Sequence, residues 1–250
     1  MAFAYKQYDT TKQQVRSKTI IALTVFLLLM TGAVFGWRWL RHQPTQDQAQ
    51  IPLRKVLNFN EVFFSSLFSN GNLAKSYVPA QAIKNPRVNG NEGISDGFDP
   101  AAWKLKVARK PGDTLYISLD ELKALPKTEI IFDFKCIEGW SMVTHWGGVL
   151  FSDFAKKYNL DTNQKYAGLV TPDQGYYVGV DMPSMLHPQT ILCYEMNDKP
   201  LELKHGAPLR LIIPVKYGIK HLKRIGTLFL SNERPADYWY ERGYDYYSGL

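Results

Sequence analysis

The pattern of hydrophobic and polar positions divides the chain into an apolar segment near its start, a polar connector and a long mixed region. Residues 19–37 contain no charged side chain, and basic residues stand on both sides of them. At about 1.5 Å per residue, such a helix crosses a bilayer core of roughly 30 Å. Trp37 and Trp39 stand where interfacial aromatic residues are common. We therefore predict a transmembrane anchor at 19–37, preceded by an amino-terminal flank at 1–18.

A cleaved signal peptide is the competing interpretation of this segment. It would have a shorter apolar centre that ends at a small-residue cleavage site. Here the apolar run continues past Gly32 and Ala33, which favours an uncleaved anchor in the lipid bilayer. Basic residues are almost balanced on the two flanks, with a slight excess on the amino-terminal one. That balance favours a periplasmic domain and leaves the cytoplasmic side open.

The rest of the chain is a polar linker at 38–52 and a soluble domain at 53–250. Short alternating segments predict strands, and capping residues before apolar runs predict a few short helices. Helices are expected in the second half of 56–68 and at 119–125, 152–158 and 182–187. Strands are expected at 103–107, 130–134, 165–171, 176–180, 209–215 and 223–230. This pattern predicts an α+β fold with a mainly β core.

Cys136 follows the predicted strand 130–134, in a glycine-containing turn. A thiol held at a strand end can serve as a metal ligand or as a nucleophile, and it can equally be a buried and inert side chain. With His145 as its base, it could belong to a cysteine hydrolase. The chain has only one other cysteine, Cys193, so the cysteine count excludes a disulfide-dense scaffold and leaves a single disulfide open.

Charge narrows the choice of partners. Lys and Arg number 30 against 23 acids, giving a formal charge of +7, but no long basic run favours nucleic acid. One segment, 210–224, concentrates basic side chains around Gly218. It could bind a phosphate or another anion, and a solvated strand face is the simpler alternative. Its basic residues are Arg210, Lys216, Lys220, His221, Lys223 and Arg224.

Four segments occur together in a fixed order: KCIEGWS at 135–141, HWGGV at 145–149, and the longer stretches 187–201 and 205–225. In this combination the chain resembles the catalytic domain of the sulfite oxidase family of molybdopterin enzymes. It is most similar to the heme-free branch that contains the bacterial methionine sulfoxide reductase catalytic subunit.

The resemblance implies a mixed α+β domain that binds molybdenum through one pterin dithiolene, with Cys136 as the protein thiolate on the metal. At the position of His205, that branch has asparagine in place of histidine. The implied pterin contacts are Asn60, Glu61, Thr171, His205, Arg210, His221, Leu222 and Lys223. Four neighbouring side chains are candidates for the substrate pocket, with catalytic roles expected at the first two: Tyr177, His145, Tyr176 and Trp146.

The implied activity is a two-electron oxygen-atom transfer on a small or protein-borne substrate of the sulfoxide or sulfite type. No arginine-rich pocket for sulfite accompanies Cys136, where only Lys135 and His145 are basic. No heme-binding domain precedes the matched region, so electrons are expected from a separate membrane cytochrome or quinone-linked partner. The alternative from another class is a non-enzymatic, membrane-tethered binding domain with a Cys136–Cys193 disulfide.

Overall fold

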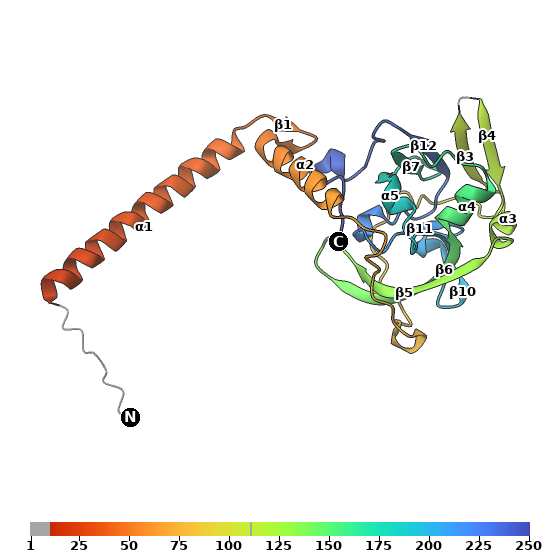
Figure 1. Ribbon diagram of the computed structural model, residues 1–250, viewed down its shortest axis with the longest axis horizontal. Helices are drawn as coiled ribbons and strands as arrows, with labels where there is room; N and C mark the ends of the chain where they lie inside the picture. The colour runs from red at the N-terminus through yellow and green to blue at the C-terminus, as the bar shows by residue number, and fades with distance from the viewer. Residues whose placement is uncertain (1–10, 111) are drawn as a thin grey trace.

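The computed structural model of the chain describes residues 11–110 and 112–250, so residues 1–10 of the predicted amino-terminal flank lie outside the described residues. Helix α1 (Lys12–Arg41) projects away from the rest of the chain and has no buried residue (Figure 1). It begins at a capping box formed by Thr11 and Gln14. It extends beyond the predicted 19–37 because its polar flanks also favour helix.

Among the described residues, α1 is the one helix that is both long enough and apolar enough to cross a membrane. Membrane anchors and signal sequences share that length and composition. Its last turn carries Arg38 and Arg41, which interact favourably with the negative end of the helix dipole.

The connection between α1 and the domain is folded, although the sequence predicts a polar linker there. Strands β1 (Thr45–Gln46) and β2 (Ala49–Gln50) pair as a small hairpin. Helix α2 (Ile51–Ser66) follows at once, so the boundary predicted at residue 53 falls inside its first turn. The buried side chain of Arg54 holds the hairpin and α2 against the domain, because it donates to the carbonyl oxygens of Asp47, Tyr240 and Tyr244 at 2.8–2.9 Å.

Two five-stranded sheets form the body of the domain (Figure 1). The first is antiparallel, in the order β10–β9–β6–β5, with β11 paired to β9. In the second, β4–β3–β12–β7–β8, only the pairing of β12 with β3 is parallel. The strands of the first are β5 (Lys127–Lys135), β6 (Ser141–Leu150), β9 (Ile191–Met196), β10 (Lys199–Pro200) and β11 (Arg210–Ile212). Those of the second are β3 (Leu105–Lys110), β4 (Asp113–Ile117), β7 (Tyr166–Val170), β8 (Tyr177–Asp181) and β12 (Thr227–Ser231).

Short helices connect and cover these strands, and the predicted α+β class with a mainly β core is confirmed. Apolar side chains of both sheets meet in one large cluster that includes Leu105, Leu169, Leu192 and Leu228. The helices are α3 (Leu119–Lys123), α4 (Phe151–Lys157) and α5 (Met182–Met185), with 3-10 turns η1 (Pro79–Gln81), η2 (Leu203–His205), η3 (Gly218–Lys220) and η4 (Tyr240–Arg242).

The structure corrects several strand predictions. β11 spans only 210–212 of the predicted 209–215, and β12 begins at Thr227 and not at residue 223. Residues 223–226 instead form a loop in which Arg224 N donates to Gly206 O, with Arg224 at φ +52°. Strands β6 and β9 were not predicted. Both are buried along most of their length, so their sequences lack the alternation that marks a half-exposed strand.

A first prediction concerns the close contact of β6 with β9. A Cβ atom added at Gly148 would lie 2.7 Å from Cys193 Cα and 2.8 Å from the Leu192 carbonyl carbon, where the strand register also shifts. Gly148→Ala should therefore lower the free energy of unfolding by about 1–3 kcal/mol, measured by thermal unfolding of the detergent-solubilised protein. Gly71→Ala is the control, because its nearest neighbour is Ser69 Oγ at 3.5 Å. Equal melting temperatures for the two variants would contradict the argument.

Candidate functional site

Cys136 is the first residue of the loop that joins β5 to β6. Lys135 pairs with Ser141 across the hairpin, which leaves residues 136–140 as the loop. Cys136 N donates to Trp140 O at 2.9 Å, and Gly139 N donates to Cys136 O at 3.0 Å. Gly139 adopts φ +90°, a conformation that glycine reaches without strain. These bonds hold the Cys136 thiol in place at the end of a core strand.

The environment keeps this thiol neutral in the free protein. Burial raises the pKa of Cys136, and a hydrogen bond from the backbone at Glu138 opposes the shift. The amide nitrogen of Asn89 lies 3.9 Å from Sγ. A bound metal ion would displace the thiol proton, because metals bind the thiolate form. The thiol is therefore suited to bind a metal ion. Without a metal it is a weak nucleophile, because burial disfavours the thiolate form.

Cys136 lines a cavity of about 200 Å³. The cavity lies where the β5–β6 hairpin meets loops from the second half of the chain. It brings together five residues that the sequence analysis had assigned to the cofactor site or the substrate pocket: Cys136, Tyr176, Arg210, His221 and Lys223. Residues separated by up to 87 positions in sequence, from Cys136 to Lys223, thus share one lining.

Arg210 is the dominant charge of the cavity. It is fully buried on β11, and its guanidinium donates to the carbonyl oxygens of His205 at 2.9 Å and His221 at 3.3 Å. Its Cζ lies 4.6 Å from the centre of the Trp146 ring, and its Nε has no partner within the described chain. Burial lowers the pKa of Arg210 to about 10. Among the described residues, no carboxylate forms an ion pair with it, so an anion in the cavity would compensate its charge.

Lys223 adds a second cation to the same wall. Its ammonium donates to the backbone carbonyl oxygens of Asn89 and, at 2.9 Å, of Gly90. Burial lowers the pKa of Lys223 to about 8, with a further lowering by Arg210. Glu92, which also lines the cavity, opposes this shift and raises that pKa. Backbone carbonyls leave the ammonium charge available to an anionic ligand.

Two histidines complete the polar part of the wall. His221 is buried against Phe134, with ring centres 4.8 Å apart, and its Nε2 lies 3.1 Å from Lys216 O. Its Nδ1 is buried and has no partner within residues 11–110 and 112–250. Burial lowers the pKa of His221 to about 3, and Arg210 adds to the shift. The ring is therefore neutral near pH 7 and can exchange hydrogen bonds with a heterocycle.

His205 lines a smaller cavity of about 40 Å³, which shares Arg210, Lys223 and Asn89 with the main one. Burial lowers the pKa of His205 to about 4, again with Arg210 contributing. The next residue, Gly206, has φ +102°, and a Cβ there would lie 2.9 Å from Lys223 Cα. This glycine lets the η2 turn approach the Lys223 loop.

The other four predicted pterin contacts do not line the main cavity. Asn60 and Glu61 lie on α2, where Glu61 forms an ion pair with Arg234. Thr171 is buried and donates to Asp173 at 2.6 Å, which shapes the turn before Tyr176. Leu222 packs fully buried in the main hydrophobic cluster.

The predicted substrate-pocket residues separate in the same way. Tyr176 lines the main cavity and donates to Ile219 O at 2.5 Å, and Trp146 lines the smaller cavity. The Tyr177 hydroxyl instead pairs with Glu241, and Tyr177 borders a separate surface hollow. His145 is buried on β6 with its Nε2 3.4 Å from Glu129 Oε2, and it lines neither cavity.

Sequence reasoning missed much of the cavity lining. Asn89 and Gly90 come from a segment for which the sequence predicts neither helix nor strand, and Trp239 and Tyr244 come from the tyrosine-rich tail. Trp140 stacks on Phe134 with ring centres 6.1 Å apart, and the Cζ atom of Arg87 lies 5.0 Å from the centre of the Trp140 ring. The Asn-Gly pair was a local signal of a special backbone. The aromatic tail carried no signal of its distance from Cys136.

Together the buried thiol and the two nearby cations make this cavity suited to an anionic, metal-bearing organic cofactor. Comparison with known proteins agrees: residues 92–239 match the family model for the oxidoreductase molybdopterin binding domain. The chain belongs to this family, and the resemblance predicted from the sequence is confirmed.

Individual relatives extend the match. A protein of Azospira oryzae with the provisional name protein-methionine-sulfoxide reductase subunit YedZ1 is 33% identical over 210 residues, 82% of this chain and 79% of the relative. The protein-methionine-sulfoxide reductase catalytic subunit MsrP of Xanthomonas campestris pv. campestris is 34% identical over 157 residues, 56% of this chain. The match covers 48% of that MsrP, so the chain matches about half the length of this relative.

The solved structure of the sulfane dehydrogenase SoxCD from Paracoccus pantotrophus shares the fold. Its TM-score is 0.50 at 16% identity, over 69% of this chain and 53% of that one. The family match, and not this structural likeness, makes the chain a molybdopterin-dependent oxidoreductase. It argues against the alternative of a non-enzymatic binding domain. Its supposed disulfide is also absent, because Cys136 and Cys193 are both free.

The residues present fit the cofactor of the family. A dithiolene-bound molybdenum accepts a soft thiolate, and Cys136 offers one in the cavity. A pterin phosphate requires cations, and Arg210 and Lys223 supply them without a bound carboxylate. The unpartnered Nε of Arg210 and Nδ1 of His221 are polar atoms that a ligand would satisfy.

The lowered pKa of Lys223 leads to a prediction on pH. An anion favours the ammonium form, so its binding should take up protons near pH 8, and affinity should fall as pH rises through about 8. Calorimetric titration of the cofactor-free protein with inorganic sulfate, an anion whose charge is constant in this pH range, measures both effects in two buffers of different ionisation enthalpy. Lys223→Arg should bind sulfate with little pH dependence between pH 7 and 9. The same fall in both proteins would rule out Lys223 as its source.

Proposed function

We propose that this chain is the catalytic part of a membrane-anchored molybdenum enzyme that reduces sulfoxides, including methionine sulfoxide in proteins. One observation carries the proposal: a buried free thiol lines the same cavity as an arginine that has no acidic partner in the described part of the chain. The first suits a molybdenum ion and the second suits the phosphate of its pterin. The names of the MsrP and YedZ1 relatives support the substrate class.

In this proposal Cys136 binds the metal through its thiolate. Arg210 and Lys223 hold the pterin phosphate, and His205 and His221 contact the ring system or its side chain as neutral imidazoles. The bound cofactor would supply a two-electron oxygen-atom transfer between the substrate and water. The β5–β6 hairpin keeps the thiolate at a constant position, because the backbone N–H of Cys136 donates to Trp140 O and its carbonyl oxygen accepts from Gly139 N.

The remaining lining would choose the substrate. Trp140, Trp239 and Tyr244 present apolar and aromatic surface, which suits the methyl and methylene groups beside a sulfoxide sulfur. Glu92 and Glu138 also line the cavity, and their carboxylates would repel an approaching dianion. The site therefore favours a neutral sulfoxide over sulfite.

The position of the enzyme and its electron supply extend the proposal. α1 would anchor the domain in the bilayer, with the domain on the periplasmic side. Reducing equivalents would come from a membrane cytochrome or a quinone-linked protein. The relatives named as subunits support such a division of labour. We expect no nucleic-acid partner.

Substitution of the two cysteines tests the metal ligand. Cys136→Ser should lose molybdenum and at least ~99% of turnover, because a serine oxygen is a poor substitute for the soft thiolate. Cys193→Ser is the control, since Cys193 lies on β9 opposite Arg210 and lines neither cavity. Elemental analysis and turnover of both purified variants are the measurements. Full molybdenum and activity in Cys136→Ser would refute the proposed ligand.

A second experiment tests the substrate class. The loaded enzyme, with a reduced dye as electron donor, should reduce methionine sulfoxide at a rate at least tenfold above its rate of sulfite oxidation with an artificial acceptor; tenfold corresponds to ~1.4 kcal/mol. Steady-state rates for both substrates at equal concentration decide the question. Glu138→Gln should narrow the difference by admitting the dianion more readily. Faster sulfite oxidation by the unmodified enzyme would show that the substrate assignment is wrong.

A further inference from the structure

Helix α2 has the reverse of the usual polarity for a helix on a protein surface. Its side toward the domain carries the buried Arg54 and also Glu61, which pairs with Arg234. Its opposite side carries an apolar stripe, defined here as Val56, Phe59, Phe63 and Leu67, whose residues are 56%, 66%, 47% and 60% exposed. Positions three and four apart lie on one helix face, so these four side chains form a continuous surface.

This stripe is free of charge over three turns. From Val56 to Leu67 the only charged residue is Glu61, on the side toward the domain. Val62 and Phe64 beside the stripe are also exposed, at 67% and 53%. A soluble helix places such residues toward its core, and a large exposed apolar patch marks an interaction site. The stripe is therefore built to contact an apolar surface outside the domain.

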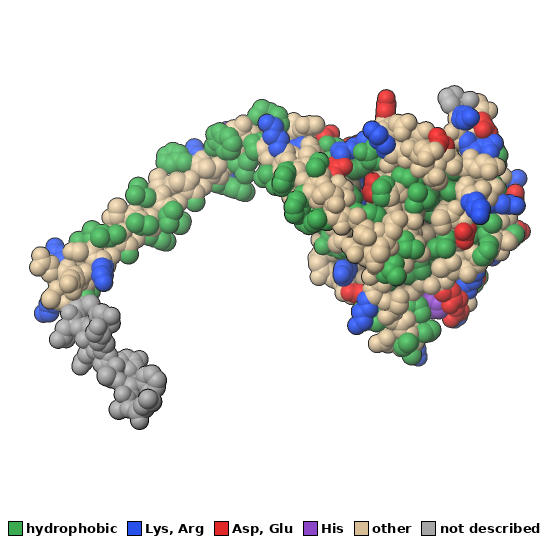
Figure 2. Space-filling view, in the orientation of Figure 1, with side chains coloured by type: hydrophobic (Ala, Val, Ile, Leu, Met, Phe, Trp, Pro, Cys, Tyr) green, Lys and Arg blue, Asp and Glu red, His purple; other side chains and the backbone are tan. Residues whose placement is uncertain are grey.

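The connection to α1 indicates which surface this is. Only residues 42–50 separate the end of α1 from the start of α2. They close on themselves, because Ile51 N donates to Pro44 O at 2.9 Å and Thr45 pairs with Gln50. α2 therefore starts beside the end of α1, near the interfacial residues Trp37 and Trp39. Figure 1 shows α2 turning sharply away from the line of α1, and Figure 2 shows hydrophobic side chains continuing from α1 onto α2.

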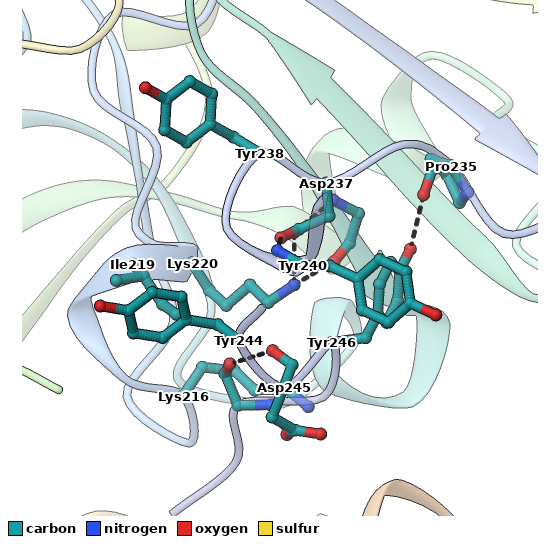
Figure 3. Close-up of polar contacts among 12 residues, drawn as sticks. Lys216, Ile219, Lys220, Pro235, Asp237, Tyr238, Tyr240, Tyr244, Asp245 and Tyr246 are labelled. Atoms are coloured by element: carbon teal, nitrogen blue, oxygen red, sulfur yellow. Dashed lines mark hydrogen bonds and ion pairs between the residues drawn. The ribbon is translucent and has the colours of Figure 1, made fainter. Parts of the chain in front are cut away.

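α2 is also fixed to the domain, so its stripe has a defined direction. Arg54 donates to the carbonyl oxygens of Tyr240 and Tyr244, and its Cζ lies 4.1 Å from the centre of the Tyr240 ring. The segment that receives Arg54 is held in turn by buried contacts (Figure 3). Lys220 pairs with Asp237, and the Tyr246 hydroxyl donates to Pro235 O at 3.1 Å.

From these contacts we infer that α2 lies in the plane of the membrane that α1 crosses, with its apolar stripe inserted into the lipid surface. A helix of 16 residues is about 24 Å long. Lying flat, it brings all four stripe residues to the same depth, as an interfacial amphipathic helix does. The inference rests on the proposed role of α1 as a membrane anchor.

Insertion of α2 would set the height of the catalytic cavity above the membrane. Tyr244 lines the cavity, and its carbonyl oxygen binds Arg54 of α2. The cavity wall and the inserted helix are thus joined by one hydrogen bond of 2.8 Å. This arrangement holds the cavity close to the lipid surface, where a membrane-embedded electron donor could reach it.

Spin labels on the full-length protein in phosphatidylcholine–phosphatidylglycerol vesicles test the inference. Nitroxides are attached at Phe59→Cys and Phe63→Cys on the stripe, at Leu28→Cys in α1, and at Tyr116→Cys on β4. Tyr116 is the matched control, because it is 61% exposed against 66% for Phe59. The two native cysteines are buried, and labelling of the unmodified protein measures their background. Collision with oxygen reports lipid, and collision with a nickel chelate reports water.

The labels at positions 59 and 63 should show an oxygen-to-nickel collision ratio several-fold above that at 116, and below that at 28. A lipid signal at 28 with a water signal at 59 and 63 would overturn the inference while the anchor stands. Labels at 59 and 63 shielded from both reagents would overturn it too, because a protein partner or a second copy would then cover α2. A water signal at 28 would refute the anchor itself, and the inference with it.

Discussion

The buried guanidinium of Arg210 is the constraint on which the cavity depends. Its charge lies between the carbonyl oxygens of His205 and His221, against the Trp146 ring, with no acidic partner among the described residues. Burial is the main cause of the lowered pKa values of His205, His221 and Lys223, and the charge of Arg210 lowers each of them further. A protein tolerates the cost when a ligand completes the site. The free protein therefore holds a positive wall prepared for an anionic cofactor.

Two elements that lie far apart in the sequence are needed to place Cys136 against that wall. The β5–β6 hairpin fixes the thiol, and β11 carries Arg210 through its pairing with Cys193 on β9. Because β6 joins β5 to β9 in one sheet, the thiol and the guanidinium are both set by strand register. Gly148 permits the close approach of β6 to β9, and Gly206 permits that of the η2 turn to Lys223. The cavity geometry is thus a consequence of sheet packing.

A single buried side chain also determines how the α1 connection and α2 are attached to the domain. Arg54 connects α2 to the segment that contains Tyr244, which lines the cavity. Its three carbonyl acceptors come from both the β1–β2 hairpin and the tail, so one side chain unites the α1 connection, α2 and the domain. An inverted α2, polar inside and apolar outside, is consistent with this role. The domain is therefore not suspended on a loose linker, as its polar sequence had indicated.

The sequence by itself determined the apolar span, the α+β class and the family, because these depend on long periodic segments and on ordered motifs. It also indicated Cys136, Arg210, His221 and Lys223, which the structure brings into one cavity. It did not predict β6 and β9, whose burial on both faces removes the alternation that marks a strand. Asn89, Trp239 and Tyr244 reach the cavity only through contacts between distant segments. Local patterns record which face of an element is buried, whereas the partner across the cavity depends on strand register and loop packing, which only the tertiary structure decides.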